Sequence, residues 1–75
     1  MSRRNKLAKE INILEEEIKL LEIKRSRSMA SLMEALISRT SPDDTDAQFF
    51  RTYTAEIDVK REQLQKMTKE LETLI

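Results

Sequence analysis

Apolar residues recur along the first half of the chain at alternating spacings of four and three positions. The clearest run is Leu7, Ile11, Leu14, Ile18 and Leu21. This spacing places the side chains on one face of an α-helix and is typical of a coiled-coil heptad repeat. Continuing the same frame reaches Arg25 and Ser28, whereas a gap of four from Arg25 reaches Met29. The second choice also collects Leu32 and Leu36, so we predict a stutter in the repeat near Arg25.

A second apolar stripe follows an interruption by proline. Pro42 cannot continue a helix and pushes Ser41 out of the α region, so the first helix must end before it. The next helix begins with either Ser41 or Thr45 as its N-cap. Its stripe again alternates gaps of three and four, and it comprises Phe50, Tyr53, Ile57, Lys60, Leu64, Met67, Leu71 and Leu74. Both segments are therefore predicted to be helices that pack through one face.

Two such helices joined by a short turn predict an all-α fold, an antiparallel two-helix coiled-coil hairpin. We place the helices at about 3–39 and about 46–74, with a turn at about 40–45. Residues 1–75 then form a single domain. A core this small rarely supplies more than ~3–5 kcal/mol of stability without a metal, a disulfide or a partner chain, so we expect the hairpin to associate.

The predicted pairing contains one layer that breaks the apolar pattern. Folding the chain at the turn pairs Leu21 with Leu64, and the next layer opposes Arg25 to Lys60. Two cations facing each other in a seam repel. We expect either that both side chains reach out to water or that a carboxylate compensates them. The carboxylates available are those of a partner chain and of Glu22, Glu56 and Glu62.

The first helix carries more apolar residues than one seam requires. The additional ones are Ile13, Leu20, Ile23, Met33 and Ile37. Exposed aliphatic surface of this extent usually marks an interface, although single surface aliphatics occur on every protein. Homo-oligomers most often close as two-fold dimers, so we expect this surface to join two hairpins in a four-helix bundle. The alternative is a complex with a different helical protein.

Composition narrows the function to non-catalytic classes. The 75 residues include no cysteine, no histidine and no glycine. This removes disulfides, thiolate and imidazole metal ligands, the usual nucleophile–base pairs and glycine-rich phosphate loops. We therefore expect no enzyme, no cofactor, no bound metal and no small-molecule partner. Apolar runs are also too short for a membrane span, and we expect a cytoplasmic protein.

Two basic clusters offer an alternative function. Arg3 and Arg4 lie near the amino end, and Arg25 and Arg27 lie in the middle of the first helix. Such clusters neutralise phosphates, and a dimer would align them into a stripe. Against this, glutamates are mixed into the same helix and the formal net charge is zero. A nucleic-acid-binding regulator is therefore the second hypothesis.

No motif identifies a family, but the layout has architectural counterparts. A short chain that folds at one turn into a dimerising hairpin resembles plasmid and phage bundle regulators, and also small secretion-system chaperones. The first resemblance implies nucleic acid as partner, and the second implies a helical protein. The leading hypothesis is a small non-enzymatic protein-protein interaction module, an adaptor, chaperone or assembly factor that acts as a homodimer or with a helical partner.

Overall fold

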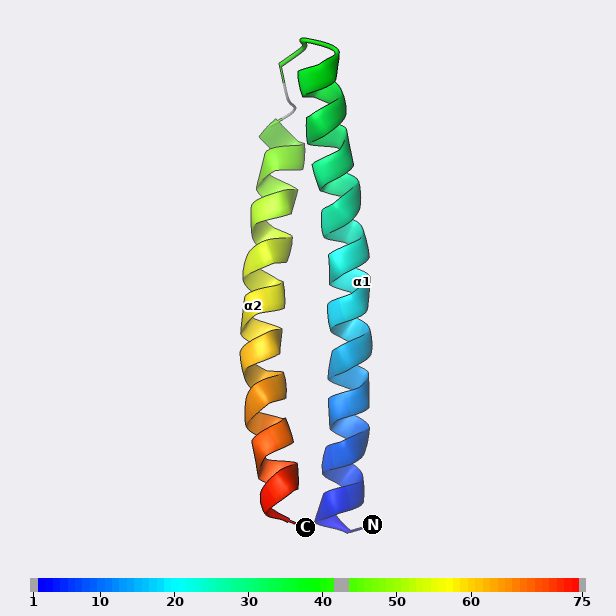
Figure 1. Cartoon of the computed structure of the whole chain (residues 1–75), viewed down its shortest axis with the longest axis vertical. Coiled ribbons are helices and arrows are strands. Elements are labelled where there is room, and N and C mark those ends of the chain that lie inside the picture. The colour runs from blue at the N-terminus through cyan, green and yellow to red at the C-terminus, as the bar shows by residue number, and fades with distance from the viewer. Residues whose placement is uncertain (1, 42–43, 75) are drawn as a thin grey trace.

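The protein is a hairpin of two long helices. The computed structural model describes residues 2–41 and 44–74. Helix α1 spans Arg3–Ile37 and helix α2 spans Asp44–Thr73, and the two run antiparallel along their lengths (Figure 1). The molecule measures 55 × 15 × 15 Å, and both ends of the chain lie at the same end of it. The described residues contain no strand, so the all-α hairpin predicted from the sequence is confirmed.

Helix α1 begins and ends with hydrogen bonds that its sequence supplies. The Ser2 hydroxyl accepts a hydrogen bond from the Asn5 backbone N–H at 3.2 Å, which caps the amino end. At the other end the Thr40 N–H donates to the Ala35 carbonyl at 2.9 Å, closing a Schellman motif. Arg39 occupies the left-handed position of this motif with φ 56°, where glycine is usual. The helix therefore ends at Ile37, two residues before the predicted limit.

Helix α2 begins at Asp44, two residues earlier than predicted. Thr45 lies inside its first turn, so Thr45 is not the N-cap. The alternative start at Ser41 involves Pro42, which lies outside the described residues. Asp44 and Asp46 both stand in the first turn, where carboxylates interact favourably with the positive end of the helix dipole.

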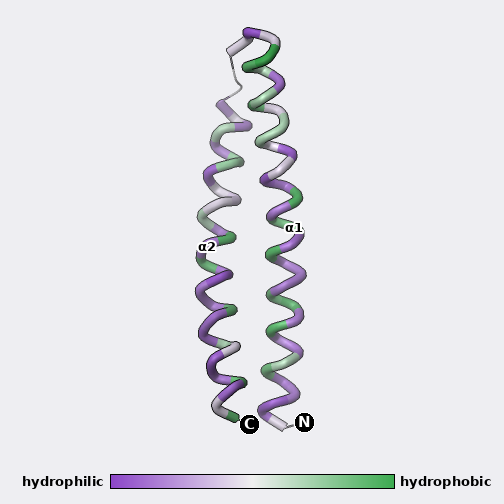
Figure 2. Tube along the Cα trace, in the orientation of Figure 1, coloured by the Kyte–Doolittle hydropathy of each residue, from purple (hydrophilic) through white to green (hydrophobic). Residues whose placement is uncertain are grey.

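The core lies between the helices in the half of the hairpin that is remote from the turn. All five residues of the first predicted run are buried, namely Leu7, Ile11, Leu14, Ile18 and Leu21. From α2, Ile57 is fully buried and packs with Leu14, Ile18 and Leu21. Figure 2 shows the apolar positions of both helices turned toward the shared interface in this half. The heptad seam predicted for Leu7 to Leu21 is confirmed.

The stutter predicted near Arg25 is wrong. Ser28 is buried and Ala35 is half-buried, as an unbroken heptad from Leu21 requires, whereas Leu32 belongs to both frames. Met29 and Leu36, which the stutter would have placed in the seam, are 41% and 68% exposed. A continuous helix keeps the same face toward its neighbour unless it is locally unwound. The buried run from Leu7 to Leu21 already fixes which face of α1 packs on α2. The unbroken heptad frame therefore places Ser28 in the interface between α1 and α2.

The predicted pairing of the two helices is also wrong, by about one heptad. The ion pairs Glu17–Lys60 and Arg3–Glu70 join positions whose numbers sum to 77 and 73, whereas the predicted pair Leu21–Leu64 sums to 85. Lys60 does not face Arg25, because its ammonium lies 2.5 Å from the Glu17 carboxylate. The two cations are thus separated, and Glu17 rather than any predicted carboxylate compensates Lys60. The repeat itself does not distinguish pairings that differ by seven residues, which explains the error.

Candidate interaction surface

The five residues predicted to form a partner interface are all exposed. Ile13, Leu20, Ile23 and Met33 are about half exposed, and Ile37 is 80% exposed. None of them belongs to the cluster that joins α1 to α2. Each therefore leaves apolar surface in water that the hairpin does not bury by itself.

Three of the five fall into a second heptad repeat that the sequence analysis missed. Ile23, Met33 and Ile37 join Ser26 and Ala30 at alternating spacings of three and four. We call these five residues the outer seam, and all of them are exposed. At 3.6 residues per turn they lie roughly opposite the face that packs on α2. The signal was present in the sequence, but Ser26 and Ala30 are not conspicuously apolar.

The two remaining predicted residues lie on another side of α1. Leu20 borders a shallow groove between the helices that Glu56 and Lys60 also line. Ile13 stands one heptad before Leu20 and shares its side of the helix. The predicted interface is therefore two neighbouring surfaces, of which only the outer seam has a coiled-coil repeat.

The flanks of the outer seam differ in chemistry. Met29 and Leu36 stand one position before Ala30 and Ile37, so they extend the apolar surface on one side. Arg27 and Glu34 each follow an outer-seam residue and stand on the other side. Both are exposed, and neither takes part in an ion pair among residues 2–41 and 44–74. One flank is thus apolar and the other carries one charge of each sign.

Helix α2 offers much less apolar surface. Its exposed large apolar residues are Phe49 and Val59, and Leu74 follows directly after its last residue. Phe49 stacks on Tyr53 with ring centroids 5.9 Å apart, so part of its ring is already covered. The surface available for another helix therefore lies mainly on α1.

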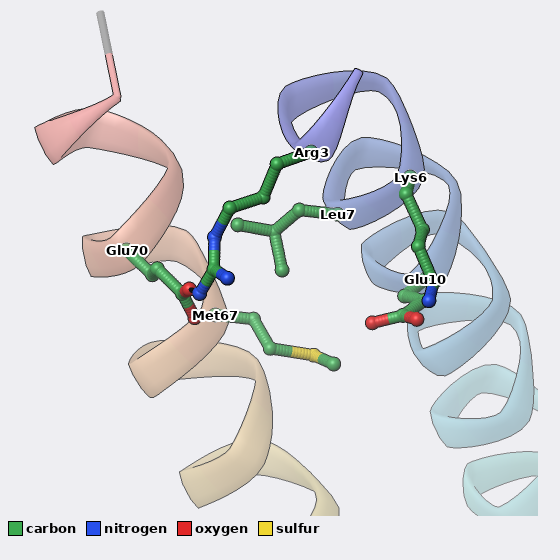
Figure 3. A pocket seen from close by; sticks show the side chains of 6 residues that line it. All are labelled: Arg3, Lys6, Leu7, Glu10, Met67 and Glu70. Atoms are coloured by element: carbon green, nitrogen blue, oxygen red, sulfur yellow. Dashed lines mark hydrogen bonds and ion pairs between the residues drawn. The ribbon is translucent and has the colours of Figure 1, made fainter. Parts of the chain in front are cut away.

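The four arginines proposed as nucleic-acid contacts do not come together in one hairpin. Arg3 forms an ion pair with Glu70 across the open end of the hairpin, beside Leu7 (Figure 3). Arg25 is half-buried and lines a groove with Phe50, whereas Arg4 and Arg27 are exposed. The two pairs are ~33 Å apart along α1 at 1.5 Å per residue. A phosphate-binding stripe would need a second molecule, and this hypothesis stays a prediction.

Three further observations on the described residues concern a surface depression, metal ligands and membrane spans. The depression in Figure 3 is lined by Leu7, Met67 and charged side chains, of which Arg3 and Glu70 pair with each other. Within residues 2–41 and 44–74, no three acidic side chains converge as metal ligands would. Neither described helix has the length of uninterrupted apolar sequence that crossing a bilayer requires. Comparisons with protein-family models, with curated proteins and with solved structures gave no match.

Proposed function

We propose that this protein is a non-enzymatic helix-binding module, an adaptor, chaperone or assembly factor that uses the outer face of α1 to hold another helix. The observation that carries the proposal is the outer seam. It is a coiled-coil repeat that faces water in the half of the hairpin where the main seam is poorest in apolar residues.

The energetics of the hairpin support the proposal. A two-helix core of this size is marginal by itself, and further burial of aliphatic side chains contributes roughly 25 cal/mol for each Å² removed from water. Ile23, Met33 and Ile37 contribute exposed aliphatic surface of this kind on one side of α1. A helix laid along them would bury it without disturbing the contacts between α1 and α2. The assembly is a dimer that places four helices side by side or a complex with one foreign helix, and we place it in the cytoplasm.

A photocrosslinking experiment tests the proposal. A benzophenone amino acid replaces Met33 in the full chain, which is then irradiated in the cells that naturally produce it. The matched control carries the same group at Val59, which is equally exposed but lies on α2. We expect a discrete crosslinked protein from position 33 and only diffuse products from position 59. Equal yields at the two positions would overturn the proposal.

A substitution provides the second arm of the test. Ala30→Glu should abolish the crosslink from position 33, because it places a carboxylate inside the apolar contact. Val59→Glu should leave that crosslink unchanged. Both variants should keep the helical circular dichroism of the parent, since neither side chain contributes to the core. An unchanged crosslink in Ala30→Glu would show that another surface of α1 binds the partner.

A further inference from the structure

We infer that the occupant of the outer seam is a second copy of this chain, with its α1 helix antiparallel to the first. The inference rests on the proposed function, because it requires the outer seam to bind a helix. It adds the identity of that helix, its direction and its register. The inference is based on self-complementarity. In a two-fold dimer both copies use the same surface, so each residue of that surface must fit the residue that faces it in the other copy.

One antiparallel register matches the four outer-seam residues from Ser26 to Ile37, and it leaves Ile23 beyond the helical end of the second copy, opposite its Thr40. With the two-fold axis between Ser31 and Leu32, Ala30 faces Met33 of the second copy, and Met33 faces Ala30. The next layer outward places Ser26 against Ile37. Each layer therefore combines a small residue with a large one, which lets the two helices approach closely and leaves no pair of large residues in collision.

The flanks match in the same register. Arg27 of one copy stands beside Glu34 of the other, and the two-fold axis repeats the pair, giving two opposite-charge contacts. Neither residue is engaged in an ion pair within the described part of its own hairpin. On the opposite flank Met29 stands beside Leu36, again twice. The charged flank of each copy therefore contacts opposite charges, and the apolar flank contacts apolar side chains.

Other arrangements of two copies fail this match. Sliding one helix by a heptad in either direction brings Arg27 against Arg27 or Glu34 against Glu34 at the two-fold axis. A parallel pair would set Met29 beside Glu34 and would use Glu22 to hold Arg27. Glu22 already pairs with Arg61 of its own hairpin at 3.4 Å. Only the antiparallel register places both Arg27 and Glu34 beside an opposite charge that is not already paired. The other arrangements lack this match, so the interface favours one register over them.

The geometry predicts an elongated dimer. The paired segments lie in the turn-proximal parts of the two α1 helices, so the open ends point away from each other. At 1.5 Å per residue the two Ser2 residues lie ~90 Å apart along the axis. Two hairpins packed side by side over their full length would instead keep the 55 Å length of one hairpin. Because the outer seam lies roughly opposite α2, the four helices near the axis form a row with the two α1 helices in the middle, rather than closing around one core.

Sedimentation equilibrium and small-angle X-ray scattering on the purified full chain test the inference. We expect a dimer whose maximum dimension is ~90 Å, as helix geometry requires. A dimer no longer than about 60 Å would overturn the antiparallel register, because overlap along the whole helix gives that length. A folded monomer up to millimolar concentration would overturn the second copy as occupant. The crosslink from Met33 would then identify a different protein, and the proposed function would stand.

Charge reversal tests the register itself. Arg27→Glu and Glu34→Arg should each weaken the dimer roughly tenfold or more, because each puts like charges at both flanking contacts. An equimolar mixture of the two variants should recover the parent affinity, since every contact between unlike chains is then a Glu–Arg pair. Lys66→Glu on α2 is the control and should leave the affinity unchanged. Failure of the mixture to recover affinity would overturn the register.

Discussion

In the open half of the hairpin, residues 3–22 and 57–73, α1 turns most of its aliphatic side chains toward α2, with Ile13 and Leu20 as exceptions. In the loop half, residues 23–56, α1 turns most of them toward water. Five aliphatics of α1 are buried in the open half, whereas Ser28 is the buried residue of α1 in the loop half among those described. Three interhelical ion pairs also involve residues of α1 in the open half, namely Arg3–Glu70, Glu17–Lys60 and Glu22–Arg61.

The difference teaches that one continuous helix carries two apolar repeats, of which only one packs against α2. The heptad phase set in the open half runs unbroken into the loop half, where it meets arginine and serine instead of leucine. Ile23, Met33 and Ile37 of that stretch instead follow a second heptad frame, which is the outer seam. If the proposed function holds, stability within the hairpin and association with another helix belong to different halves. The following changes break or sharpen that contrast.

Truncation of Ile57 should have the largest effect. Ile57 has 0% exposure and packs against three α1 residues of the open half, so Ile57→Ala should cost ~2–4 kcal/mol of unfolding free energy. Leu36→Ala in the loop half removes an exposed side chain and should cost less than about 0.5 kcal/mol in dilute solution. Urea unfolding followed by circular dichroism measures both. Similar losses in the two variants would contradict the contrast between the halves.

Relief of the turn should strengthen the loop half. Arg39 holds a left-handed backbone conformation that costs a side chain with a Cβ about 1–2 kcal/mol. Arg39→Gly should therefore raise the unfolding free energy by about 1 kcal/mol, after allowing for the greater freedom of glycine in the unfolded chain. Arg39→Ala keeps the Cβ and serves as the control. A gain as large in the alanine variant would mean that loss of the charge, rather than relief of the backbone, is responsible.

Replacing the serine in the seam should give a smaller gain. Ser28→Ala removes a hydroxyl from a buried position and improves helix propensity, so we expect a gain of about 0.5–1 kcal/mol. Ser31→Ala changes an exposed serine of the same helix and should gain only the propensity part, about half as much. Thermal unfolding at low protein concentration compares them. A larger gain at position 31 would contradict the continuous heptad.

Neutralising Glu17 should have the smallest effect. Glu17→Gln removes the partner of Lys60, but both side chains are partly exposed, so solvent screens the pair. We expect a loss of about 0.5 kcal/mol that shrinks as sodium chloride is added. Glu16→Gln, which removes a fully exposed pair with Lys19, should have no measurable effect. A loss at position 17 that does not depend on salt would point to packing rather than charge.

Sequence alone was sufficient for the open half of the fold. Leu7 to Leu21 and the stripe from Ile57 onward leave one consistent face on each helix, so two antiparallel helices follow from hydrophobic spacing. It was insufficient for the loop half, where Met29 and Leu36 compete with Ser28 for the seam. Local hydrophobicity favours Met29 and Leu36 as seam residues. Because the helix continues from the open half without a break, it keeps the frame that places Ser28 in the seam.

The pairing of the helices and the interface were predictable to different degrees. Heptads that differ by one repeat look alike, and the position of Glu17 beside Lys60 became evident only in three dimensions. Exposure of Ile23, Met33 and Ile37 follows from counting more apolar residues than one seam needs. Their grouping with Ser26 and Ala30 depends on knowing which face of α1 is already occupied.

Amide hydrogen exchange at two protein concentrations tests the central claim most directly. In dilute solution, amides of α1 in the loop half should exchange faster than those of Leu7 to Leu21, because the main seam there buries little apolar surface. At high concentration, protection should rise over residues 23–37 and remain unchanged in the open half. Equal protection of both halves, independent of concentration, would contradict the division of α1 into a stabilising half and a binding half.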